Sequence, residues 1–247
     1  IGKQTLQSCT EGQSNTVVGN IAGVSLTDGD LNTFIGNQAA YSATTVREAV
    51  VIGHAAGSGI MTTDANGTVA VGAVALNGIT TGQYNVAVGY YALEKMTELD
   101  KNTAVGYQAL KEMSGSAGTG KNTAVGYKAG SALTTATHTV LIGSTAGESI
   151  TTGTANTIIG SKALDALTTG GSNVAVGYVA ASGLATGTEN VTIGTWAMYS
   201  ADGSESKNVA VGYAALYFLN NNGTNANVGV GYEAGQYNVT GTNNTSI

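Results

Sequence analysis

The chain has 247 residues, including 37 glycines and no proline, and only 10% of its residues are charged and 6% aromatic. Its net charge is -6 with 9 Lys and Arg, which excludes the basic surface expected of a nucleic-acid or anionic-membrane binder. No apolar run approaches the roughly 20 residues of a membrane-spanning helix, so we expect no membrane span in this chain.

A glycine-centred motif recurs along the whole chain, most clearly as NTAVGYQAL at 102–110 and NTAVGYKAG at 122–130. Successive motif glycines are 17 to 20 residues apart, at positions 2, 19, 36, 53, 72, 89, 106, 126, 143, 160, 177, 194, 212 and 231. A short fixed period of this kind predicts a solenoid. We therefore predict an all-β protein, a parallel β-solenoid (β-roll or β-helix) of about 14 coils, in which 1–247 is a single array. Both ends cut the motif, so we expect a segment of a longer fibre protein.

Each coil is predicted to begin with a short β-strand just before the motif glycine, which is numbered zero. Val or Ile occupies position -1, Val or Thr occupies -3, and Ala is the most frequent residue at -2. Side chains at -1 and -3 share one face of a strand, and those at -2 and -4 share the other. Because three consecutive positions are apolar or Thr, we expect the strand to be covered on both faces.

An asparagine precedes most of these strands, at position -4. Stacked coils place equivalent residues about 4.8 Å apart, so these amides are predicted to form a ladder that ties the layers together. The predicted ladder consists of Asn15, Asn32, Asn85, Asn102, Asn122, Asn156, Asn173, Asn190, Asn208 and Asn227.

Two small or apolar columns follow the glycine. Position +3 is Ala in all thirteen full copies, which predicts close approach to the next layer or to another chain. Position +7 is apolar in nearly every coil, at Leu26, Ile60, Ile79, Met96, Met113, Leu133, Ile150, Leu167, Leu184 and Leu219. Cys9 takes this place in the first coil and is interpreted as a buried small residue. The longer gaps are predicted to add residues in one loop, at 61–67, 114–120, 202–207 and 220–226.

Tyrosine recurs at the corner position +1 and is predicted to form a broken stack on the outside. These residues, with the lengthened loops, are the candidate surface for binding a cell-surface receptor or glycan. They are Tyr90, Tyr107, Tyr127, Tyr178, Tyr213 and Tyr232.

Several patterns resemble catalytic or ligand sites without the partners that such sites need, so we predict no enzyme activity, cofactor or metal. Residues 115–121 match the spacing of a phosphate loop, but Asn122 follows and opens a strand. The two histidines, His54 and His138, are five coils apart, or about 24 Å, too far to share a metal. The Asp-Gly-Asp sequence at 28–30 lacks a nearby ligand set and is interpreted as a turn. The lysines at position -5 are interpreted as solvated.

The motifs NVAVG at 85–89 and 173–177 resemble the repeat of YadA-like trimeric autotransporter adhesin heads, and 102–110 resembles the repeats of long phage tail fibres. The resemblance spans the chain, although the period here is longer than in the adhesin heads and Asn stands where those usually have Ser. It implies a parallel β-roll, an intertwined or side-by-side homotrimer, and a place in the stalk or head of an attachment fibre.

The sequence therefore predicts a non-enzymatic structural protein, the repetitive rod of an extracellular or virion fibre, with phage tail fibre slightly favoured. The alternative is a bacterial surface adhesin head whose lateral Tyr and loop surface binds a receptor or glycan. A monomeric solenoid such as an ice-binding protein is less favoured, because Thr alternates with Val at position -3.

Overall fold

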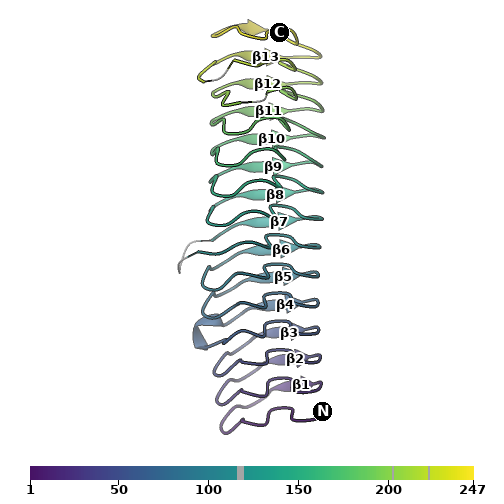
Figure 1. Ribbon diagram of the computed structural model, residues 1–247, viewed down its shortest axis with the longest axis vertical. Coiled ribbons are helices and arrows are strands. Elements are labelled where there is room, and N and C mark those ends of the chain that lie inside the picture. Colours follow the sequence, from purple (N-terminus) through teal and green to yellow (C-terminus); the bar gives the residue numbers. More distant parts are fainter. Residues whose placement is uncertain (116–119, 202, 222) are drawn as a thin grey trace. The chain divides into compact units, whose positions relative to one another are not determined.

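The computed structural model describes residues 1–115, 120–201, 203–221 and 223–247, which form two compact units, Ile1–Lys121 and Asn122–Ile247. Each unit is a parallel β-solenoid with one short strand per coil, which confirms the predicted fold class (Figure 1). The first unit contains β1 (Thr16–Val18), β2 (Thr33–Ile35), β3 (Val50–Ile52), the 3-10 helix η1 (Thr63–Ala65), β4 (Val69–Val71), β5 (Val86–Val88) and β6 (Thr103–Val105). The second contains β7 (Thr123–Val125), β8 (Val140–Ile142), β9 (Thr157–Ile159), β10 (Val174–Val176), β11 (Val191–Ile193), β12 (Val209–Val211), β13 (Val228–Val230) and β14 (Thr245–Ser246).

Equivalent residues of successive coils lie opposite one another within each unit. Val174 of β10 pairs with Val191 of β11, which is 17 residues later, and Val209 of β12 pairs with Val228 of β13, which is 19 residues later. The register is therefore independent of coil length, because the additional residues lie outside the strands.

In strands β1–β13 the buried residue is the one at position -2, where the sequence pattern is least regular. Position -2 points into the solenoid, where Phe34, Leu141 and Ala175 are fully buried. Positions -1 and -3 point outward, and Ile142 and Ile159 remain 38% exposed. A single chain covers only one strand face, because the narrow interior of one coil accommodates only one row of side chains from each strand, and cover of the other face stays a prediction.

The rest of the interior is built from the Ala column at +3 and the apolar column at +7. Twelve of the thirteen +3 alanines are buried, Ala234 in the last coil being the exception. The +7 residues are fully buried in nine of the ten predicted coils, whereas Ile60 is 58% exposed. Met61, one residue later, is fully buried in its place. In this lengthened coil, part of the insertion therefore lies before the core residue, and not only in 61–67 as predicted.

The motif glycine is required by both backbone conformation and space. Its φ lies between 131° and 148° in every coil, a region that residues with a Cβ rarely adopt. A Cβ added to Gly177 would lie 2.6 Å from the carbonyl carbon and oxygen of Gly194 in the next coil. The glycine corner therefore allows coils to stack at the spacing of a parallel sheet.

Candidate functional site

Asparagine side chains at position -4 link successive coils inside each unit. The backbone N and Nδ2 of Asn102 donate to Oδ1 of buried Asn85, at 2.9 and 3.1 Å, and Asn85 Nδ2 donates to the Leu99 carbonyl at 2.8 Å. The same pattern joins Asn15 to Asn32. Equivalent backbone bonds run without interruption through Asn156, Asn173, Asn190, Asn208 and Asn227. These amides form hydrogen bonds with backbone groups next to the start of each strand, so their role is structural.

The ladder is interrupted where another residue occupies position -4. Ala49 can only donate its backbone N–H to Asn32 Oδ1, at 3.0 Å, and Thr139 donates its own to Asn122 Oδ1 at 2.9 Å. Asn122 Nδ2 in turn donates to the Ala136 carbonyl at 2.9 Å. Where Ala or Thr occupies position -4, the ladder of side-chain amides is therefore interrupted at that coil.

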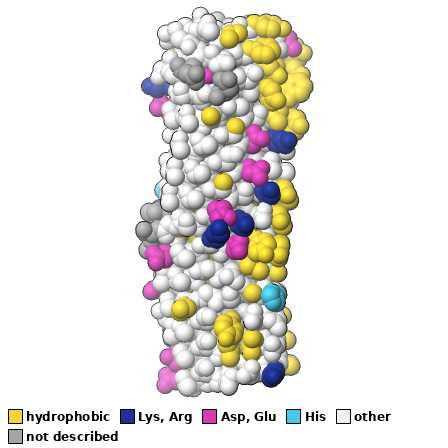
Figure 2. All heavy atoms as spheres, viewed as in Figure 1, with side chains coloured by type: hydrophobic (Ala, Val, Ile, Leu, Met, Phe, Trp, Pro, Cys, Tyr) yellow, Lys and Arg dark blue, Asp and Glu magenta, His cyan; other side chains and the backbone are white. Residues whose placement is uncertain are grey.

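The tyrosines at position +1 lie on an exposed corner and are 36% to 73% exposed. Tyr213 and Tyr232 stack with their ring centroids 5.2 Å apart and an interplanar angle of 8°, and Tyr90 and Tyr107 stack at 5.9 Å and 27°. Figure 2 shows hydrophobic side chains gathered along an edge of each unit, with charged groups between them. The structure therefore forms the predicted broken stack, whose role in binding stays a prediction.

A second exposed surface is formed by the outward side chains of the strands. We call the residues at -1 and -3 of β1–β6 and of β7–β13 the outer sheet face of each unit. Every one of these residues is Thr, Val or Ile, and none is charged. Seven of the -1 residues are 37% to 40% exposed: Val18, Ile35, Val125, Ile142, Ile159, Ile193 and Val230. Extended uncharged surfaces of this kind mark interaction sites.

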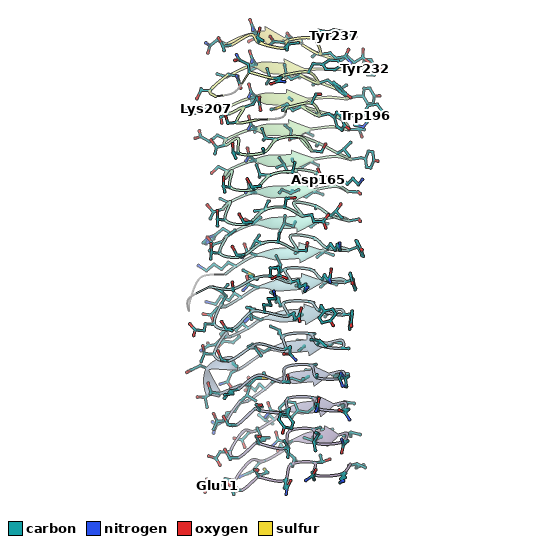
Figure 3. All side chains as sticks on the ribbon, in the orientation of Figure 1. Glu11, Asp165, Trp196, Lys207, Tyr232 and Tyr237 are labelled. Carbon is teal, nitrogen blue, oxygen red and sulfur yellow. The ribbon has the colours of Figure 1, made fainter. Side chains whose placement is uncertain are left out.

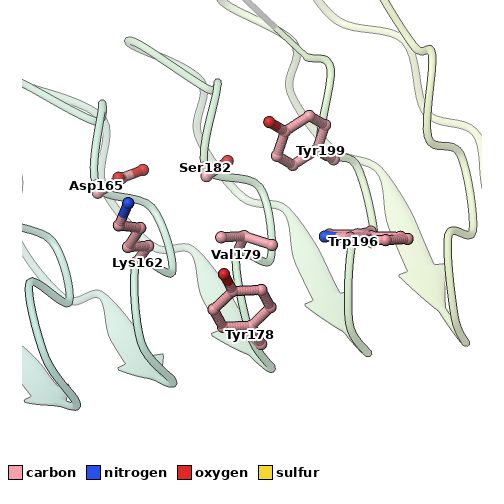
Figure 4. A pocket seen from close by; sticks show the side chains of 7 residues that line it. All are labelled: Lys162, Asp165, Tyr178, Val179, Ser182, Trp196 and Tyr199. Carbon is pink, nitrogen blue, oxygen red and sulfur yellow. The ribbon is translucent and has the colours of Figure 1, made fainter.

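The second unit also contains a groove that crosses three consecutive coils. Its volume is about 370 Å³. One side is formed by residues at +1 and +2 and the other by residues at +5, as the close-up in Figure 4 shows. The lining residues, which we call the aromatic groove, are Lys162, Asp165, Tyr178, Val179, Ser182, Trp196 and Tyr199.

Local backbone conformation projects two of these side chains from the corner. Lys162 and Trp196 both occupy position +2, where φ is 56° and 61°. This left-handed conformation occurs at +2 in every coil. Lys162 and Trp196 are exposed there, whereas Val179, at 7% exposed, forms the floor of the groove. Trp196 is 37% exposed, and Tyr199 on the opposite side is 38% exposed.

The polar end of the groove carries opposite charges. Partial burial raises the pKa of the Asp165 carboxyl, while Lys162 opposes that shift and Glu148 adds to it. Glu148 itself lies 3.4 Å from Lys128 in an ion pair between neighbouring coils. Figure 3 places Asp165 and Trp196 on the same edge of this unit, with Lys207 on the opposite edge.

The aromatic walls continue beyond the groove toward the C-terminal coils. On the corner side, the Trp196 and Tyr213 ring centroids are 5.4 Å apart, and the stack continues to Tyr232. On the other side, Tyr199 and Tyr217 are 5.2 Å apart. Two rows of aromatic rings therefore run along the solenoid, one coil spacing between neighbours.

Sequence reasoning identified Tyr178 but missed its partners. Trp196 is displaced by one position from the tyrosine column, and Tyr199 and Tyr217 belong to the +5 column, whose other residues are mostly polar or charged. Comparing the +2 and +5 columns would have shown that Trp196 and Tyr199 belong to the same coil. Only the structure shows that the two columns face each other across a groove.

The other candidate patterns form no ligand site among the described residues. Residues 116–119 of the phosphate-loop match lie outside that part of the chain. Asp28 accepts from Thr10 Oγ1 at 3.2 Å, and Asp30 accepts from the Gln13 N–H at 2.8 Å, as expected of turn residues. Cys9 is a half-buried free thiol. The described ranges contain no cluster of three or more His, Cys, Asp or Glu that could hold a metal, and no helix long and apolar enough to cross a bilayer.

Comparison with known proteins adds no relative. No family model, curated protein or solved structure matches this chain. The likeness to tail-fibre and adhesin repeats therefore rests on the sequence motif, whereas the β-solenoid fold is established by the stacking of the coils.

Proposed function

We propose that this chain is a non-enzymatic structural protein, the repetitive part of an extracellular attachment fibre that self-associates through its outer sheet face. The observation that supports the proposal is the composition of that face, which contains only Thr, Val and Ile in β1–β13 while Val and Ile at -1 remain exposed. Parallel sheets are almost always covered on both faces, so a sheet with one uncovered apolar face favours a partner.

The partner that fits this face best is another copy of the chain. The outward side chains repeat once per coil, at the spacing of a parallel sheet, so a partner that packs along the whole face must have the same repeat. The face itself adds no like-charge repulsion to this contact, because it contains no charged residue. Three copies is the number that the motif's resemblance to fibre repeats implies.

The proposed mechanism is mechanical. Within each unit, hydrogen bonds connect one coil to the next at several points, for example from Gly177 N to the Ile159 carbonyl at 2.8 Å and from Val179 N to the Ser161 carbonyl at 3.0 Å. Together with the buried asparagine ladder, these bonds resist bending and stretching along the coil stack. A stiff rod of this kind would hold a binding region away from the surface of a phage or cell.

The native mass of the assembly tests this proposal directly. Sedimentation equilibrium should give three times the chain mass of 24.5 kDa. Ile35→Lys places a charge on the outer sheet face and should lower that mass toward the monomer. Ile60→Lys is the matched control, because Ile60 is more exposed, at 58% against 38%, and belongs to a loop. A folded wild-type monomer would overturn self-association.

Two other functions are distinguished by further observations. A bacterial adhesin head would be joined to a membrane-anchor barrel or coiled-coil stalk, and a phage fibre to a baseplate-attachment domain, so the full-length sequence separates them. A monomeric ice-binding solenoid needs a regular Thr array, but only five of the thirteen -3 residues in β1–β13 are Thr. Thermal hysteresis in a folded monomer would favour that alternative.

A further inference from the structure

We propose that the aromatic groove of the second unit binds a saccharide chain, which lies along the solenoid across three coils. Tyr178, Trp196 and Tyr199 would contact the sugar rings, and Lys162, Asp165 and Ser182 would bind the hydroxyl groups. The groove is formed by one chain and lies beside the outer sheet face, so this inference does not depend on self-association.

The exposed aromatic rings provide the first argument. Tyr178 is 53% exposed, Trp196 37% and Tyr199 38%, although aromatic side chains contribute most to stability when they are buried. Their rings offer flat apolar surfaces, while the tyrosine hydroxyls and the indole N–H remain available for hydrogen bonds. A sugar ring has the complementary chemistry, since its C–H groups form an apolar face and its hydroxyls project from the edges.

The arrangement of polar groups provides the second argument. Ligand sites combine an apolar lining with a few convergent polar side chains, and here those are Lys162 and Asp165 at one end and Ser182 in the middle coil of a groove of about 370 Å³. A carboxylate accepts, an ammonium donates and a serine hydroxyl does both, so together they match vicinal hydroxyl groups.

The coil spacing provides the third argument. Neighbouring coils are about 4.8 Å apart, which is close to the length of one pyranose unit in an extended chain. The groove spans three coils, and the rings continue from Trp196 to Tyr213 at 5.4 Å and from Tyr199 to Tyr217 at 5.2 Å. A repeating ligand could therefore place one sugar in each coil, with more than one unit bound.

Charge argues against the other ligand class that stacks on aromatic rings. Single-stranded nucleic acid requires a positively charged groove beside its stacking platforms. In this groove the positive charge of Lys162 is balanced by the negative charge of Asp165. In the preceding coil, Glu148 of the +5 column forms an ion pair with Lys128. A neutral or weakly charged saccharide is therefore favoured over a polyanion.

The chain carries its own probe for this site, because Trp196 is its single tryptophan. Intrinsic fluorescence of the assembled full chain should be titrated with maltohexaose, cellohexaose and chitohexaose, after a glycan array has identified further neutral and acidic probes. We expect a saturable change in Trp196 emission with at least one saccharide, and none with oligouridylate. A saturable response to oligouridylate and to no saccharide would overturn the proposal. So would the absence of a response to every glycan on the array.

Variants locate the binding. Tyr178→Ala and Tyr199→Ala should each weaken binding by about tenfold, and Tyr199→Phe, which keeps the ring, should weaken it less. Tyr41→Ala is the matched control, because Tyr41 occupies the same +5 position as Tyr199 and is 42% exposed, but belongs to the first unit. Circular dichroism checks that each variant is folded. Equal affinity in all four variants would mean that the groove is not the site.

Discussion

Asn173 offers the sharpest test of the asparagine ladder, because its buried side chain makes four hydrogen bonds. Its Nδ2 donates to Asn156 Oδ1 at 3.2 Å and to the Gly187 carbonyl at 2.9 Å, and its Oδ1 accepts from the backbone N and Nδ2 of Asn190 at 3.0 and 3.1 Å. Asn173→Ala removes all four. Two of the partners keep another bond, because Asn173 N still donates to Asn156 Oδ1 and Asn190 Nδ2 still donates to the Glu205 carbonyl.

The expected cost follows from the two groups that lose this bond inside the solenoid. The Gly187 carbonyl loses the Asn173 amide donor, and the Asn190 backbone N–H loses the Asn173 Oδ1 acceptor. Leaving a buried polar group unsatisfied costs about 1–3 kcal/mol, so we expect Asn173→Ala to lower the free energy of unfolding by about 2–6 kcal/mol. Water entering the vacated space would give the lower value. Asn173→Thr should cost less, since Thr68 shows that a hydroxyl at this position can donate to the equivalent carbonyl.

Urea unfolding followed by circular dichroism measures this difference. Because each coil contacts only its neighbours, hydrogen exchange should also show the loss of protection concentrated in the coils around Asn173. Asn37→Ala provides the control, because Asn37 is exposed at the corner and its loss should change stability by less than about 0.5 kcal/mol. Equal stability of Asn173→Ala and Asn37→Ala would refute a stabilising ladder.

Three further changes test the coil design. Gly177→Ala should destabilise the protein more than Gly231→Ala, because both have positive φ but only Gly177 has a carbonyl at 2.6 Å, whereas the nearest atom to a Cβ on Gly231 is 3.8 Å away; equal melting temperatures would contradict the steric argument. Met61→Ala should cost about 2–5 kcal/mol and Ile60→Ala much less, and denaturant unfolding showing the reverse would place the wrong residue in the core. Burial raises the pKa of Asp165, so its contribution to stability is present below the ordinary Asp pKa and is lost as the pH rises through the folded-state pKa. Asp165→Asn should therefore raise stability at about pH 7 and have little effect near pH 3, and a gain that does not depend on pH would rule out this cause.

The repeat alone determined the architecture. Regular spacing of the motif glycines predicted a parallel solenoid, and the Asn and Ala columns predicted contacts between layers, because stacking places equivalent residues next to each other in every coil. Insertions outside the strands left the register unchanged, as the pairing of Val209 with Val228 shows. In such a fold each coil contacts mainly its two neighbours, so the contacts of one coil predict those of the others.

Tertiary structure decided which way each row of side chains faces and which columns meet. Alternation along a strand separates -1 and -3 from -2, but only the path of the chain around the corner shows that Phe34 points inward and Ile35 outward. The exposure of Ile60 and burial of Met61 depend likewise on how an insertion is accommodated. The aromatic groove joins Trp196 to Tyr199 and Tyr178 across separate coils and columns, a relation that depends on how far the backbone turns between positions +2 and +5 and that no linear spacing encodes.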